Sequence, residues 1–78
     1  MLYDERLKNV MVDVLENRMS AIADHIRVLL EQGYIPTKNK TTILNWSSIL
    51  LSAYENIDVF TEEQHHKIDT ICNKVLKL

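Results

Sequence analysis

The chain has 78 residues, of which 46% are hydrophobic and 26% charged, and its formal net charge is −2. This length admits one small domain and excludes a second. The slightly negative charge provides no overall positive field for a phosphate backbone, so nucleic acid is disfavoured as a partner. The single cysteine, Cys72, excludes an internal disulfide and fits a reducing compartment.

Turn-forming residues are scarce, and this scarcity decides the fold class. One glycine and one proline are too few for the turns of a many-stranded β fold. The sequence therefore predicts an all-α fold, a three-helix bundle with a long N-terminal helix that forms a single domain over residues 1–78. The start at Met1 is followed by charged residues rather than an apolar signal, and no apolar run is long enough to span a membrane. We expect a complete cytoplasmic protein without membrane contact.

The first predicted helix covers about residues 4–32, a stretch without glycine or proline that ends before Gly33. Its apolar arc covers roughly 220° at 100° per residue, so this helix needs burial on more than one side. A break near residues 17–20, which would give four short helices that bury everything internally, is the alternative. Apolar residues in alternating three- and four-residue steps form a heptad seam: Val12, Leu15, Met19, Ile22, Ile26 and Leu29.

Two shorter helices are predicted after a connector over residues 34–40. The second helix covers about residues 41–57, and the third covers about 62–77 after a capping-box sequence that begins at Thr61. At about 1.5 Å per residue the first helix is roughly 43 Å long, against about 25 Å for each of the others. The first helix therefore overhangs its neighbours. We expect a second copy or another protein to cover the surplus apolar surface.

Two pairs of residues stand out within the predicted interface. Arg18 and His25 interrupt the apolar arc seven residues apart, which places them either at a core edge or in a polar contact that sets the register of an interface. Trp46 and Tyr54 are aromatic residues of the kind that anchor interfaces and also fill cores. The complete set of predicted protein-interface residues is Val12, Leu15, Arg18, Met19, Ile22, His25, Ile26, Leu29, Trp46 and Tyr54.

Residues able to support catalysis or metal binding form no recognisable site in the sequence. His65, His66 and Cys72 lack the Cys-x-x-Cys or His-x-x-x-His spacing of zinc sites. Glu62 and Glu63 belong to the first turn of the third helix, where the helix dipole favours acidic residues. No glycine-rich loop is present to hold a phosphate. We therefore expect no catalytic residue, cofactor, metal or small-molecule substrate, and a protein that is not an enzyme.

The leading hypothesis is a non-catalytic protein-binding module, an adaptor, inhibitor or regulator of a larger protein, that forms a homodimer through its first helix. Richness in Ile, Lys and Asn favours a phage or mobile-element accessory gene, on composition alone. One alternative is a dimeric DNA-binding transcriptional regulator, which the acidic start of the third helix opposes. A purely structural dimer or spacer is a further alternative. The DNA alternative relies on four lysines: Lys38, Lys40, Lys67 and Lys74.

Overall fold

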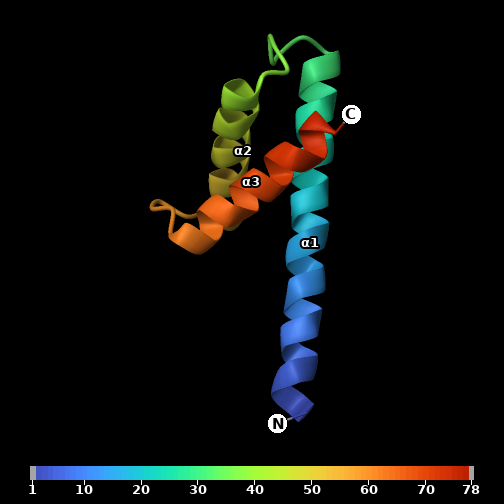
Figure 1. The fold of residues 1–78 in the computed structure, drawn as a ribbon, viewed down its shortest axis with the longest axis vertical. Helices are drawn as coiled ribbons and strands as arrows, with labels where there is room; N and C mark the ends of the chain where they lie inside the picture. Colours follow the sequence, from blue (N-terminus) through green and yellow to red (C-terminus); the bar gives the residue numbers. More distant parts are fainter. Residues whose placement is uncertain (1, 78) are drawn as a thin grey trace.

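The computed structural model describes the backbone of residues 2–77 and the side chains of residues 6, 7 and 9–77. It contains three α-helices, α1 (Leu2–Glu31), α2 (Lys40–Glu55) and α3 (Glu62–Leu76). α1 and α2 pack together at one end of the molecule, and α3 crosses both (Figure 1). The predicted all-α class and the three-helix arrangement are therefore confirmed. Within residues 2–77, no helix combines the length and apolarity needed to cross a membrane.

α1 ends in a Schellman motif at Gly33. This glycine has a φ of +81°, in the left-handed region that residues without a Cβ adopt at little cost. The Tyr34 amide donates to the Leu29 carbonyl at 2.9 Å, and the Gly33 amide donates to the Leu30 carbonyl at 3.2 Å. Ile35 follows and is buried. The predicted helix end at Gly33 is confirmed, and the turn brings the chain back onto the core.

Asparagine side chains and backbones set both ends of α2. The Asn39 side chain accepts the Thr42 amide at 2.8 Å, which satisfies one of the free amides of the first turn. α2 ends at Glu55 rather than at Ile57, the end that the sequence pattern predicts. The reason is Asn56, whose φ of 52° is left-handed and stops the helix.

α3 begins with the capping box that the sequence predicts. The Thr61 hydroxyl accepts the Gln64 amide at 3.4 Å, and the Gln64 side chain accepts the Thr61 amide at 2.8 Å. Glu62 and Glu63 occupy the first turn, where negative charge is favourable. The start of α3 is therefore fixed by local chemistry.

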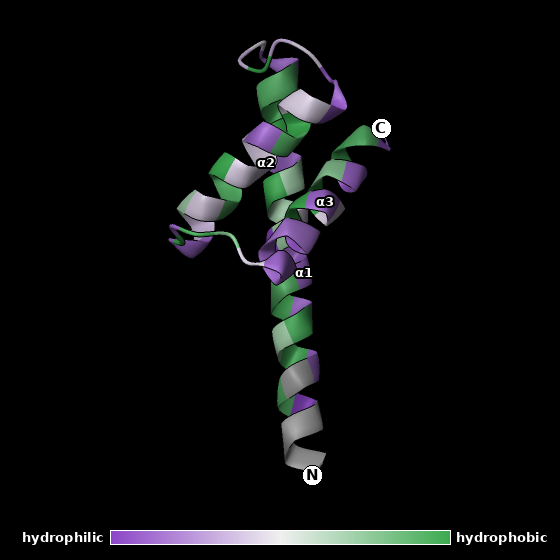
Figure 2. Cartoon of the chain, turned by 60° about the vertical axis from the view of Figure 1, so that its left-hand side comes forward, coloured by the Kyte–Doolittle hydropathy of each residue, from purple (hydrophilic) through white to green (hydrophobic). Residues whose placement is uncertain are grey.

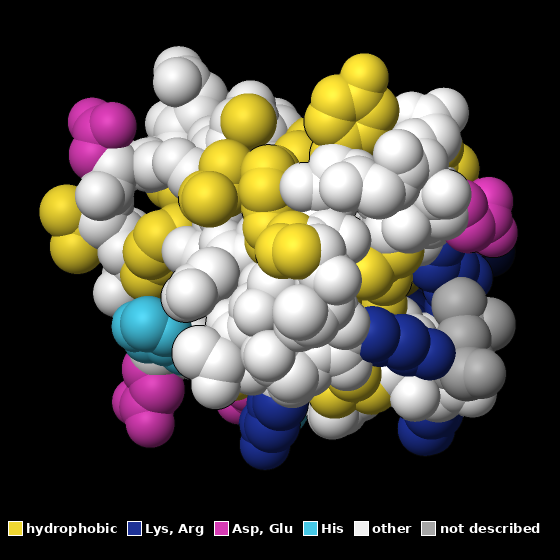
Figure 3. Space-filling model, turned by 90° about the horizontal axis from the view of Figure 1, so that it is seen from above, with side chains coloured by type: hydrophobic (Ala, Val, Ile, Leu, Met, Phe, Trp, Pro, Cys, Tyr) yellow, Lys and Arg dark blue, Asp and Glu magenta, His cyan; other side chains and the backbone are white. Residues whose placement is uncertain are grey.

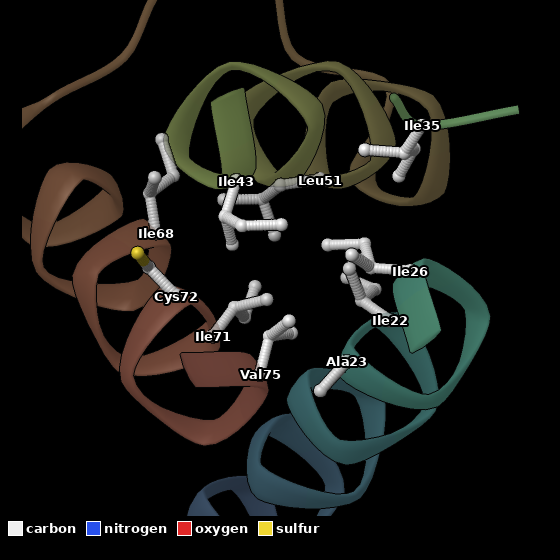
Figure 4. Packing of buried hydrophobic residues seen from close by; sticks show 10 residues of the cluster. All are labelled: Ile22, Ala23, Ile26, Ile35, Ile43, Leu51, Ile68, Ile71, Cys72 and Val75. Carbon is white, nitrogen blue, oxygen red and sulfur yellow. The ribbon is translucent and has the colours of Figure 1, made fainter. Parts of the chain in front are cut away.

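The core lies where the three helices meet, along the C-terminal part of α1 (Figure 4). Branched aliphatic side chains dominate it, and the Ser47 side chain of α2 is also fully buried. Among the described side chains of α1, the first fully buried one is Ile22. The preceding part of the helix therefore contributes little to the core. The buried apolar set is Ile22, Ala23, Ile26, Ile35, Ile43, Leu51, Ile68, Ile71, Cys72 and Val75.

The N-terminal part of α1 extends beyond the bundle as a single helix (Figures 1 and 2). We call residues 2–18 the overhang. The molecule measures 48 × 25 × 17 Å, and its radius of gyration is 13.7 Å. A compact domain of this length has a radius of gyration of about 11.5 Å. The difference reflects the overhang, in which nearly all of the described side chains are exposed.

Candidate protein-binding surface

Four apolar side chains form an uncovered stripe along the overhang. Leu7, Val10, Met11 and Val14 are 51%, 60%, 57% and 45% exposed. Their spacing of three, four and seven residues places them on one side of the helix. We call these four residues the α1 stripe. Figure 2 shows green apolar segments alternating with purple polar ones along this part of α1, with neither α2 nor α3 beside it.

The same side of α1 continues past the α1 stripe. Arg18, Ala21, His25 and Val28 follow Val14 at steps of four, three, four and three residues, which is a heptad repeat. All four are exposed, and Val28 is 45% exposed despite being apolar. The centre of this side is rotated by about 100° from the core side, at 100° per residue. α1 therefore has one side for its own bundle and another that no described part of the chain covers.

The heptad seam predicted from the sequence falls mainly on the core side. Ile22 and Ile26 are fully buried in the core of the single chain, so they are not accessible to a partner. Val12 is 49% exposed. The structure places Ile22 and Ile26 inside because α2 and α3 pack on the side of α1 that holds them. Three further seam residues are partly buried: Leu15, Met19 and Leu29.

Arg18 and His25, which the sequence places either at a core edge or in an interface, are both exposed. They lie on the side of α1 that continues the α1 stripe, at equivalent heptad positions. The sequence singles out the two residues but gives no reason to assign them to this side. That assignment depends on where α2 and α3 pack.

A second, smaller apolar area lies on α2. Trp46 is partly buried against the core, whereas Ile49 is 56% exposed. Ala53, one turn further along, is also exposed. Tyr54, the other aromatic residue predicted at an interface, is 49% exposed. This area lies on the bundle itself and is separate from the overhang.

The end of the bundle where α1 meets the connector carries mixed chemistry. Figure 3 views this end and shows apolar side chains beside lysines and arginines, with acidic groups toward the margins.

Elsewhere in the fold, Lys67 pairs with Glu55 at 3.4 Å and Lys74 donates to Ser20 at 3.0 Å. Two of the four lysines that favour DNA contact are therefore already engaged inside the chain.

Cys72 is buried, and its thiol is a weak nucleophile. Its Sγ lies 4.0 Å from the Lys40 carbonyl oxygen, and burial raises the pKa of the thiol. A thiol with a raised pKa stays protonated at neutral pH and is a weak nucleophile. Among the described residues, His, Cys, Asp and Glu side chains form no cluster of three or more that is suited to a metal ion.

A groove between α2 and α3 holds Ser48, His65 and Asp69 among its lining residues. These are the residue types of a hydrolytic triad, which requires hydrogen bonds from nucleophile to base and from base to acid. Within the described part of the chain, no hydrogen bond joins the three. The His65 ring lies instead against Phe60, with ring centroids 5.9 Å apart. Among the described residues, Ser48, His65 and Asp69 therefore do not form a hydrogen-bonded triad in this structure.

In comparisons with known proteins, no family model, curated protein or solved structure matches the chain. The candidate surface is therefore defined by exposure, spacing and shape alone. Its most distinctive part is the α1 stripe.

Proposed function

We propose that this chain is a non-catalytic protein-binding module of the adaptor, inhibitor or regulator type, with the α1 stripe as its binding surface. The observation that carries the proposal is the exposure of four apolar side chains on a helical segment that has no neighbouring helix in the described part of the chain. Contiguous apolar surface of this kind usually marks an interaction site. Covering each half-exposed Leu, Val or Met gains on the order of 1 kcal/mol.

The overhang also supports the proposal because a lone helix of its length needs a packing partner to be stable. An isolated helix of this length is marginal in water, because most helical stability in proteins comes from packing of an apolar face. The overhang has such a face but no packing partner among the described residues. A protein that packs on the α1 stripe supplies the missing contact. In the bound state we expect α1 to be one long helix.

The expected recognition mode is helix against helix or helix in a groove. Both modes use apolar anchors spaced by three, four and seven residues, which is the spacing of the α1 stripe. A different protein and a second copy of the chain both meet this requirement, and a two-fold contact allows one surface to cover its own copy. The homodimer, the cytoplasmic location and the phage or mobile-element origin stay predictions from the sequence.

A co-purification experiment with two matched variants tests the proposal. The tagged chain is the bait, an untagged copy is added, and retained proteins are quantified by mass spectrometry. Val14→Lys places a charge on the α1 stripe, and Glu16→Lys places one on the opposite side of the same overhang. We expect a stoichiometric protein, foreign or the untagged copy, with wild type and Glu16→Lys. With Val14→Lys its recovery should fall by about tenfold or more.

Retention of no protein, or equal retention by both variants, contradicts the proposal. Both substitutions lie in the overhang, outside the core. Neither is therefore expected to unfold the bundle, and circular dichroism checks this.

A further inference from the structure

We infer that the occupant of the α1 stripe is the overhang of a second copy of this chain, packed antiparallel so that the two bundles lie at opposite ends of the dimer. This inference rests on the proposed function and deepens it by naming the partner. Three observations support it: the exposed area of the chain, the equal length and pattern that two copies of the overhang present to each other, and the positions of Arg18 and His25.

The exposed area is larger than that of an average folded monomer of this mass. The accessible surface is 5770 Å² for a chain of 9.1 kDa, whereas a folded monomer of that mass exposes about 4,900 Å². The excess of about 900 Å² is close to the roughly 800 Å² that each partner buries in a standard interface. Pairing of two overhangs covers the α1 stripe and so removes part of this excess from each chain.

The overhang also matches itself in length and pattern. It spans about 25 Å at 1.5 Å per residue, and its apolar residues follow a heptad rhythm. Two copies related by a two-fold axis present the same stripe to each other over the same length. Each overhang then gains the packing that a helix of this length requires in water.

The side chains that interrupt the heptad decide the direction of pairing. In a parallel, in-register pair, Arg18 faces Arg18 and His25 faces His25 of the other copy, because equivalent heptad positions meet in the seam. Two guanidinium groups held together in a partly desolvated seam repel each other strongly. A parallel dimer is therefore disfavoured by Arg18 and His25, which follow the α1 stripe on the same side of the helix.

Antiparallel pairing removes this conflict. With the two-fold axis between residues 12 and 13, Met11 faces Val14 of the other copy, and Leu7 faces Arg18. The aliphatic stem of Arg18 then packs along Leu7 while its guanidinium reaches water at the end of the seam. His25 falls beyond the end of the opposite overhang. The seam is thus built from the overhangs alone, and the bundles stay apart.

Solution mass is the first part of the test. Sedimentation equilibrium of the full chain over a wide concentration range is expected to give twice the chain mass of 9.1 kDa. Val14→Lys is expected to give the single-chain mass, and Glu16→Lys is expected to behave as wild type. A single-chain mass for the wild type at every concentration overturns the inference. The proposed function is then judged separately, by whether a foreign protein is retained in the co-purification.

Distances between spin labels are the second part, measured on the full chain in a Cys72→Ala background. Labels at Glu31→Cys are expected to lie about 55 Å apart along the dimer axis if the pairing is antiparallel. In a parallel dimer the separation is close to the 8–10 Å between packed helices, lengthened by the label linkers. Labels at Glu16→Cys lie near the axis, so they report a short distance and confirm dimerisation. A short distance at position 31 overturns the antiparallel arrangement.

Discussion

Arg27 of α1 donates from its guanidinium to the backbone carbonyl of Lys74 in the last turn of α3, at 2.7 Å. Carbonyls of a final helical turn lack partners within their own helix, and the helix dipole makes that end negative. Arg27 therefore supplies both a donor and a positive charge where α3 needs them. The Lys74 ammonium in turn donates to Ser20 of α1 at 3.0 Å. These contacts fasten the C-terminal end of α3 to α1.

Replacing Arg27 is expected to weaken the bundle. Arg27→Met keeps the aliphatic stem but leaves the Lys74 carbonyl without its donor, at a cost of about 1.5–3 kcal/mol in the free energy of unfolding. Urea titration followed by circular dichroism measures this loss. The control is Asp24→Asn, since the Asp24 side chain of the Arg27–Asp24 pair at 2.8 Å is 69% exposed and the pair contributes less than about 1 kcal/mol. Equal losses in the two variants would contradict the role assigned to the α3 contact.

Two serines of α2 are expected to respond in opposite directions. Ser47 is fully buried, and its hydroxyl has no hydrogen-bond partner among the described residues. Ser47→Ala should therefore raise the free energy of unfolding by about 1 kcal/mol. The Ser52 hydroxyl donates to the Ile57 carbonyl at 2.7 Å, so Ser52→Ala should lower it by about 1 kcal/mol. The same urea titration compares them, and a loss of stability in Ser47→Ala would indicate an undetected partner for that hydroxyl.

The ion pair between Glu55 of α2 and Lys67 of α3 is expected to show strong coupling. Its atoms are 3.4 Å apart, and the side chains are only 12% and 15% exposed. Lys67→Met leaves a poorly solvated carboxylate and should cost about 2 kcal/mol. The double variant with Glu55→Met should recover most of this loss, because two apolar side chains replace a costly desolvated pair. A double-mutant cycle in urea measures the coupling, and simple additivity of the two losses would refute it.

Stability is expected to fall at alkaline pH through Cys72. Burial raises the pKa of this thiol in the folded chain, while in the unfolded chain it titrates near its ordinary value of about 8.5. The stabilisation that the buried, protonated thiol contributes is complete below the pKa of the unfolded chain, about 8.5. It is lost as the pH rises from there through the folded pKa, because the unfolded state releases its proton first.

The measurement for Cys72 compares unfolding free energies at about pH 7 and pH 9.5 for the wild type and Cys72→Ala. The wild type should lose more stability over this interval, since the variant has no thiol to titrate and shares every other group. An identical loss in both proteins would show that the thiol does not contribute. Alkylation of the folded wild type at pH 8 should also be much slower than alkylation in urea.

Local features of the fold are predictable from the sequence where one residue type performs a known role at a helix end. Gly33 and the Thr61–Gln64 capping box mark two such ends. Asn56 was harder to recognise, because asparagine enters the left-handed region less often than glycine and the apolar pattern continues to Ile57. Periodicity alone therefore places the end of α2 too late.

The candidate surface was less predictable, for a different physical reason. Periodicity shows that α1 is apolar over a broad arc, but it does not say which part of that arc α2 and α3 will cover. Those helices cover Ile22 and Ile26, so the exposed part is the neighbouring side that holds Leu7 and Met11. Contacts between distant residues, such as Arg27 with Lys74, likewise depend on helix packing that no local pattern specifies.

The uneven burial along α1 has a consequence for how this chain can change over generations. Residues from Ile22 onward are held by the core, so substitutions there threaten folding. Leu7 and Met11 lie outside that core, so a mutation there leaves the bundle folded and, under the proposed function, alters only what the overhang binds. If the proposed function holds, substitutions in this one short segment can change the binding partner over many generations, while the bundle stays the same.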